Sequence, residues 1–133
     1  MPPDNSCLRL SGPLRSPAAV VLIAALAIRA GVLWGLPGGF ARDIDGYAAV
    51  ADNLLRHGVF GYGERATAFR PPLYPILLAA VRAPGWSWTW GAGILHLVLG
   101  VATVALAMSL GRRLGLGEQA WIAGVLTACD PLL

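Results

Sequence analysis

Two carboxylates and one arginine are the residues of this sequence whose chemical types invite functional roles. Asp43 and Asp45 are separated by a single residue, Tyr47 follows them, and Arg70 directly precedes a Pro-Pro pair. A carboxylate can accept a proton from a substrate, or it can cap a helix by accepting hydrogen bonds from the first-turn N–H groups. A guanidinium binds phosphate, including the phosphate of a lipid headgroup. The residue types alone leave both roles of each group open.

Histidine and cysteine do not predict a metal site. His57 precedes Gly58, a pattern typical of a helix end. His96 lies in an uncharged apolar stretch, where a hydrogen bond to a neighbouring helix is more typical than metal ligation. Cys7 and Cys129 lie far apart, with neither metal-ligand spacing nor a disulfide framework. We therefore assign no metal ligands and no certain cofactor; the sequence leaves a requirement for a divalent metal open, but no residue pattern supports one.

The composition is typical of a membrane protein. Of the 133 residues, 56% are hydrophobic and 13% are charged, and the mean hydropathy is +0.64. Soluble domains carry roughly 45–50% apolar and about 25% charged residues. The net charge is +3, but the ten cations are arginines scattered along the chain. These features exclude a disordered chain, a coiled coil and a nucleic-acid-binding module, so no nucleic-acid partner is expected.

Two apolar stretches are long enough to cross a bilayer, which takes about 20 helical residues. Residues 91–110 carry no charge and predict a transmembrane helix. Residues 18–36 predict another, whose leucine, isoleucine and valine content offsets the cost of Arg29, about 2.5–3.5 kcal/mol at mid-helix. A charge inside a span suggests function by default, but we expect Arg29 to snorkel to the outer interface. A cleaved secretory signal is the alternative for this first stretch.

A third apolar stretch, residues 120–133, is too short to cross the membrane before the sequence stops. We expect it to be a truncated transmembrane helix of a longer protein. Arg9 and Arg15 precede the first span and Arg112-Arg113 follow the second, so both flanks are expected in the cytoplasm. The expected segments are a cytoplasmic N-terminus at 1–17, spans at 18–36 and 91–110, an outer loop at 37–90, a cytoplasmic loop at 111–119 and the truncated span at 120–133.

The outer loop is expected to contain two short helices, near 45–57 and at 72–82, joined by a loop at 59–69. The first has an apolar face at helical spacing, and the second has a proline in its first turn followed by an apolar stripe. Both are too short to span, so we expect the first to lie along the outer membrane surface and the second to be an interfacial or re-entrant helix. The predicted fold class is an all-α membrane protein with two transmembrane helices, the start of a third, and two juxtamembrane helices.

Three motifs occur in a set order between the two spans. They are DIDGY from Asp43, HGVF from His57 and RPPLYP from Arg70. In this order the chain, over about residues 17–133, resembles the start of the polytopic GT-C glycosyltransferases of the glycosyltransferase family 39 type. That group includes protein O-mannosyltransferases and lipid A aminoarabinose transferases.

The resemblance implies transfer of a sugar from a polyprenyl-phosphate donor to an unidentified acceptor on the outer face of a bacterial inner membrane. It implies that Asp43, or as second choice Asp45, lies near the reaction centre and takes the proton of the acceptor hydroxyl. Arg70 matches a basic residue that would stabilise the donor phosphate, and Tyr47 and Tyr74 would contact the substrate. Because such enzymes have many more transmembrane helices, we expect this chain to be inactive by itself.

The alternative is a small non-enzymatic membrane protein, such as a transporter subunit or an assembly factor. The carboxylates and the arginine of the outer loop favour the enzyme. Membrane lipid is an expected partner under both hypotheses.

Overall fold

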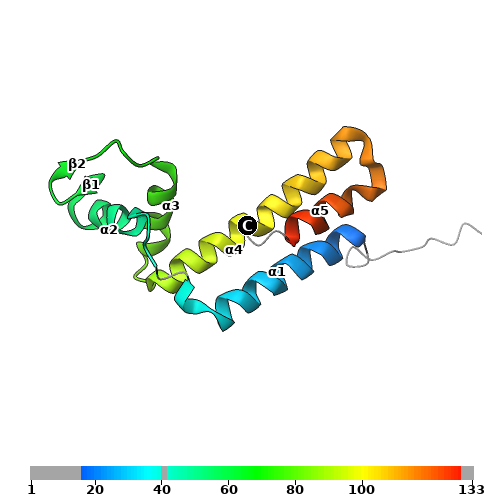
Figure 1. Ribbon diagram of the computed structural model, residues 1–133, viewed down its shortest axis with the longest axis horizontal. Coiled ribbons are helices and arrows are strands. Elements are labelled where there is room, and N and C mark those ends of the chain that lie inside the picture. The colour runs from blue at the N-terminus through cyan, green and yellow to red at the C-terminus, as the bar shows by residue number, and fades with distance from the viewer. Residues whose placement is uncertain (1–15, 40–41, 130–133) are drawn as a thin grey trace, which may run out of the picture.

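Helices dominate the computed structural model, which describes residues 16–39 and 42–129 (Figure 1). Helix α1 spans Pro17–Gly35 and helix α4 spans Trp88–Gly111. Both are long and apolar enough to cross a membrane by length and composition. The two predicted long apolar helices are therefore present in a mostly helical protein.

Serine side chains set where the two long helices begin. The hydroxyl of Ser16 accepts a hydrogen bond from the Ala19 N–H at 3.2 Å, and that of Ser87 accepts one from the Trp90 N–H at 3.4 Å. Such N-caps satisfy donors that have no partner inside the helix. Because Ser87 supplies this cap, α4 begins before residue 91, where the apolar stretch alone placed its start.

Helices α1 and α4 run in opposite directions side by side, and glycines bring them close (Figure 1). A Cβ on Gly93 would lie 3.2 Å from Cγ of Leu33, and one on Gly100 would lie 3.2 Å from Cζ of Arg29. Each glycine is thus a notch that receives one side chain of α1. Toward the other end of the pair, the buried contact is made by Val21, Ala25, Val104 and Met108.

The side chain of Arg29 turns away from the C-terminal end of α1. Its Nη1 donates to the carbonyl oxygen of Ala25 at 3.4 Å, one turn toward the N-terminus. The expectation that Arg29 snorkels outward is therefore wrong. Helical side chains lean toward the N-terminus, and the notch at Gly100 gives this one room to do so.

The chain reverses after α4 through a π-helical turn at Arg112–Leu116 and a 3₁₀ turn at Gly117–Ala120. Gly115 lies within the reversal at φ 92°, a left-handed conformation that glycine adopts without strain.

Helix α5, Trp121–Ala128, then packs against both α4 and α1. Gly124 allows the close approach, because a Cβ there would lie 3.0 Å from Cγ1 of Val21. Helix α5 lies within the stretch 120–133, whose role as a truncated span stays a prediction, and residues 130–133 lie outside the described residues.

Residues 42–83 form a second unit, called the α2–α3 unit below. It contains helix α2 (Tyr47–His57) and helix α3 (Leu73–Arg82), which correspond to the two short helices expected in the loop. Gly58 closes α2 at φ 67°, as its position after His57 predicts.

A small hairpin lies between these helices, where the sequence predicted a loop. Strands β1 (Gly61–Tyr62) and β2 (Arg65–Ala66) pair antiparallel, with Gly61 opposite Ala66 and Tyr62 opposite Arg65. The side chain of Asn53 holds this hairpin to α2. Its amide donates to the carbonyl oxygens of Val59 and Gly63, each at 2.9 Å, and its oxygen accepts from the Gly63 N–H at 2.8 Å.

The α2–α3 unit is fixed to the first turns of α4 (Figure 1). One buried cluster joins the three helices, and its members are Ala51, Leu78, Ala79, Ala92 and Leu95. A polar contact supports it, because the Trp88 indole donates to Asp52 at 3.3 Å and Arg82 lies 3.7 Å from the same carboxylate. The unit is therefore packed against the start of α4 through both apolar and polar contacts.

Candidate functional site

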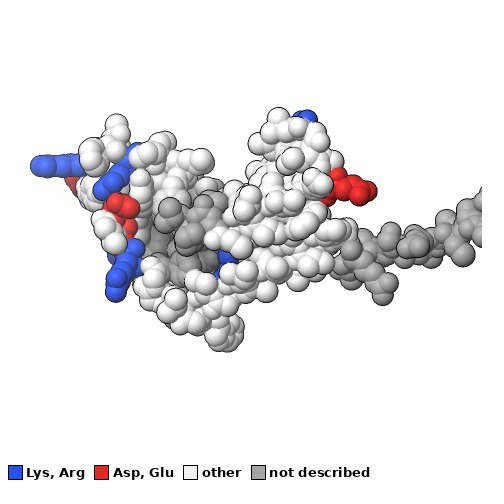
Figure 2. Space-filling view, turned by 45° about the vertical axis from the view of Figure 1, so that its right-hand side comes forward, with Lys and Arg blue, Asp and Glu red and all other residues white. Residues whose placement is uncertain are grey.

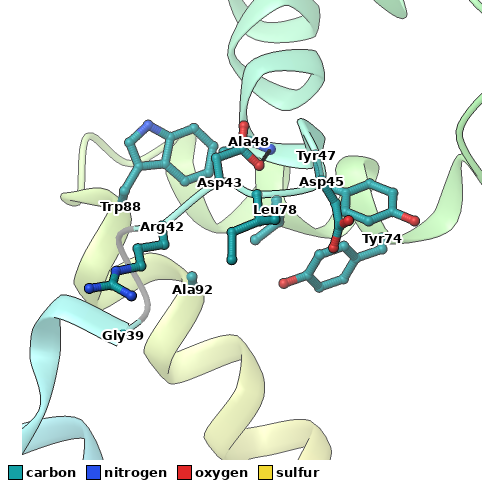
Figure 3. Close-up of a pocket in the computed structure, with 11 residues that line it drawn as sticks. Gly39, Arg42, Asp43, Asp45, Tyr47, Ala48, Tyr74, Leu78, Trp88 and Ala92 are labelled. Atoms are coloured by element: carbon teal, nitrogen blue, oxygen red, sulfur yellow. Dashed lines mark hydrogen bonds between the residues drawn. The ribbon is translucent and has the colours of Figure 1, made fainter.

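A cavity of about 400 Å³ opens where the α2–α3 unit meets the start of α4 (Figure 3). It brings together four of the five predicted site residues, the carboxylates of Asp43 and Asp45 and the rings of Tyr47 and Tyr74. The fifth, Arg70, does not line it. The other lining residues are Gly39, Arg42, Ile44, Ala48, Leu78, Trp88 and Ala92.

Asp43 caps helix α2. Its Oδ1 accepts a hydrogen bond from the Ala48 N–H at 3.0 Å, and its Oδ2 accepts one from the Ala49 N–H at 2.9 Å. The carboxylate reaches these donors because Gly46 turns the chain at φ 71° just before the helix. The capping role is thus confirmed, and both oxygens of Asp43 are already engaged. Figure 3 shows the Asp43 carboxylate beside Ala48.

The carboxylate of Asp45 differs from that of Asp43. Within the described residues it makes no hydrogen bond and no ion pair, and its side chain is exposed. Figure 3 shows the carboxylate on the side of the cavity where Tyr47 and Tyr74 lie. Of the two predicted carboxylates, Asp45 is the one available to a molecule that enters.

The aromatic rings beside Asp45 form a continuous series that ends on α4. Tyr47 and Tyr74 meet edge to face with ring centroids 5.2 Å apart, and Tyr74 meets His96 in the same way at 5.8 Å. The Tyr74 hydroxyl also lies 2.7 Å from Nε2 of His96. The prediction that His96 bonds to a neighbouring helix is therefore confirmed.

The hydroxyl of Tyr74 keeps its proton. Burial raises the pKa of Tyr74 above its ordinary value, and the charge of Asp43 and the neighbouring Tyr47 raise it further. A neutral phenol can donate one hydrogen bond while it accepts others.

Arg70 contacts the Tyr47 ring but does not line the cavity. Its Cζ is 5.2 Å from the Tyr47 ring centroid and 5.1 Å from that of Phe69, so the guanidinium stacks between two aromatic rings. A Cβ on Gly46 would lie 4.0 Å from Nη2 of Arg70 and 2.9 Å from the Tyr62 hydroxyl. Arg70 and the hairpin thus support the turn that presents Asp45.

Arg42 and Trp88 line the cavity, but neither was identified from the sequence as a candidate site residue. Arg42 is the cation of the cavity, and Figure 3 shows its side chain extending from the carboxylates toward Gly39. Trp88 adds an indole from the first turn of α4. The adjacency of Arg42 to Asp43 would have indicated it, whereas the contribution of Trp88 depends on how α4 packs.

Across the described residues, no three His, Cys, Asp or Glu side chains gather where they could hold a metal ion. His57 is exposed in the last turn of α2. No protein-family model, curated protein or solved structure matches the chain.

Proposed function

We propose that this chain is the N-terminal part of an integral-membrane glycosyltransferase of the GT-C type. It moves a sugar from a polyprenyl-phosphate donor to an acceptor on the outer face of a bacterial inner membrane. One observation carries the proposal: an open cavity at the end of two long apolar helices holds a free carboxylate, Asp45, among aromatic rings. This position suits a donor anchored in the bilayer and an acceptor in water.

The distribution of charge supports the membrane placement. On the face seen in Figure 2, charged side chains gather over the α2–α3 unit and over the turn after α4, and the long surface between is almost uncharged. Trp34 and Trp90 meet near the cavity end with ring centroids 6.0 Å apart, and both are exposed. Exposed indoles are typical of the membrane–water interface. In this placement Arg112 and Arg113 face the cytoplasm, α1 enters from there, and α2 and α3 lie at the outer surface.

Asp45 acts as the general base in this proposal. It takes the proton from the acceptor hydroxyl as the acceptor oxygen attacks C1 of the sugar. The bond between C1 and the phosphate oxygen breaks, and its electron pair leaves with the polyprenyl phosphate. Asp43, whose oxygens both bond to α2, holds the turn that positions Asp45.

Arg42 is the cation proposed to stabilise the charge left on the phosphate, because it lines the cavity with the carboxylates. Arg70 holds the Tyr47 ring by stacking on it. Tyr47, Tyr74 and Trp88 offer flat apolar faces to the sugar ring.

The test is transfer of a radiolabelled sugar from polyprenyl-phosphate donors, using membranes that contain the protein expressed from its full reading frame. Asp45→Asn is expected to abolish transfer, and Asp43→Asn to reduce it in step with protein stability. Glu64→Gln is the matched control, because Glu64 is an exposed acid in the hairpin turn. Absence of transfer by the unmodified protein with every donor would overturn the proposal and favour a non-enzymatic membrane protein.

A further inference from the structure

Helix α3 carries an exposed apolar stripe. Its members recur at the spacing of one helix face, and they are Leu73, Ile76, Ala80 and Ala83. The other face of α3 carries Leu78 and Ala79, which are buried in the cluster that joins α3 to α2 and α4. The stripe therefore faces away from both of these helices.

The exposed apolar surface is large for a short helix outside the two long ones. Leu73 is 69% exposed, and Phe69, one turn before it, is 82% exposed. Large apolar side chains exposed together mark contact with a protein or a membrane. The acids of the α2–α3 unit lie elsewhere, on α2, in the segment before it and in the hairpin turn, and they are Asp43, Asp45, Asp52 and Glu64.

The position of α3 favours lipid as the cover of this stripe. Figure 1 shows α3 on the side of the α2–α3 unit that is nearer the rest of the bundle, with α2 and the hairpin on the far side. In the membrane placement of the proposed function, α3 is therefore the part of the unit nearest the bilayer. Trp86 and Trp90 continue the exposed apolar surface onto α4, where they line one groove with Ile94.

Arg70 lies directly before the stripe and has no polar partner in the part of the chain that the structure describes. Its guanidinium makes no hydrogen bond and no ion pair there, although its Nε is buried. The rings of Tyr47 and Phe69 stack on it, with centroids 5.2 and 5.1 Å from Cζ. Because the rings occupy its faces, a partner reaches the guanidinium along its edge.

The arginine at the other end of α3 differs in this respect. Arg82 lies 3.7 Å from the Asp52 carboxylate and donates a hydrogen bond to the carbonyl oxygen of Trp86. Arg70 has no such anion, so its donors are available to one from outside the described chain. A guanidinium binds phosphate through paired hydrogen bonds. A phospholipid offers its phosphate directly above the acyl chains that would cover the stripe.

We infer that the stripe of α3 lies in the acyl-chain region of the outer leaflet and that Arg70 binds the phosphate of a bilayer phospholipid. Helix α2 and the hairpin then face water. The inference shares its membrane placement with the proposed function but does not depend on sugar transfer. The phosphate belongs to a lipid of the bilayer and not to the polyprenyl-phosphate donor.

Spin-label accessibility in the full protein tests the position of the stripe. The protein is reconstituted in phosphatidylcholine–phosphatidylglycerol vesicles in a background with Cys7→Ala and Cys129→Ala, with a water-soluble nickel complex on both sides of the bilayer. The label is attached at Ala80→Cys or, as the matched control, at Ala49→Cys, because Ala49 is an exposed alanine of α2. At position 80, collisions with oxygen are expected to exceed collisions with nickel several-fold, and at position 49 the order is expected to reverse.

Two results at position 80 would overturn the inference. Ready collision with nickel would show that the stripe faces water. Exclusion of both oxygen and nickel would show that protein covers the stripe, either a second copy or another segment.

Native mass spectrometry with added phosphatidylglycerol tests the phosphate site. Arg70→Gln is expected to weaken lipid retention several-fold and Arg70→Lys to weaken it less, because lysine keeps the charge but not the paired donors. Arg65→Gln is the matched control, since Arg65 is an exposed arginine of β2, and it should leave retention unchanged. Equal retention by Arg70→Gln and the unmodified protein would overturn the site. Weaker retention of polyprenyl phosphate with unchanged retention of phosphatidylglycerol would assign Arg70 to the donor instead.

Discussion

The hydroxyl of Tyr74 lies 2.7 Å from Nε2 of His96, which joins the α2–α3 unit to a long apolar helix by a side-chain hydrogen bond. The two residues are far apart in sequence, on α3 and α4. The bond places the Tyr74 ring in the cavity wall and ties its orientation to α4.

Removal of this hydroxyl should loosen the unit from α4. We expect Tyr74→Phe to lower the free energy of unfolding by about 1 kcal/mol, because the ring contacts remain while one hydrogen bond is lost. Thermal unfolding of the purified protein in detergent measures this change. Tyr62→Phe is the control, since among the described residues the Tyr62 hydroxyl makes no hydrogen bond, and an equal loss in both variants would contradict the role of His96.

The raised pKa of Tyr74 predicts a late step in alkaline titration. Burial, then the charge of Asp43, then Tyr47 favour the neutral phenol in the folded state. The stability that this preference contributes is complete below the unfolded pKa of about 10 and is lost as pH rises through the higher folded value. Tyrosinate absorbance should therefore show a phase above pH 10 that is missing in Tyr74→Phe. A missing phase centred at or below pH 10 in Tyr74→Phe would count against the buried phenol.

Substitution of Asp43 should lower the free energy of unfolding, whereas substitution of Asp45 should leave it nearly unchanged. Asp43→Ala removes both bonds to the start of α2 and is expected to cost about 1 kcal/mol of unfolding free energy. Asp45→Ala should leave stability within about 0.5 kcal/mol, as is usual for an exposed residue without partners. Chemical denaturation of both variants measures the difference, and a larger loss for Asp45→Ala would reverse the assignment.

The hairpin should depend on Asn53. Asn53→Ala deletes both bonds to Gly63 in the hairpin turn and the bond to Val59 just before the hairpin, and we expect faster hydrogen exchange at the Gly63 amide and its neighbours. Asn53→Asp keeps the acceptor for the Gly63 N–H but loses both donors, so its exchange should be intermediate. Unchanged exchange in Asn53→Ala would show that strand pairing alone holds the hairpin.

The helices were predictable because their patterns are local. Apolar length identified α1 and α4, and the repeat of apolar residues identified α2 and α3 within a few residues of their bounds. Which of the two carboxylates caps α2 was not predictable, since the cap depends on the left-handed turn at Gly46 that brings Asp43 back to α2.

Features that depend on distant residues were missed for the same reason. The hairpin needs the side chain of Asn53, and the direction of Arg29 needs the empty space at Gly100 on another helix. The residues adjacent to the hairpin or to Arg29 in sequence therefore do not predict these two features. The same holds for Trp88, which lines the cavity because tertiary packing brings the start of α4 beside the carboxylates.

The notches at Gly93 and Gly100 limit how α1 and α4 can slide. They lie about two helical turns apart and are filled by Leu33 and Arg29, so a shift by one turn would press both side chains against occupied surface. The two helices therefore have one axial setting. Because Trp88 and Ala92 of α4 line the cavity, that setting also fixes where the cavity lies along the length of α1.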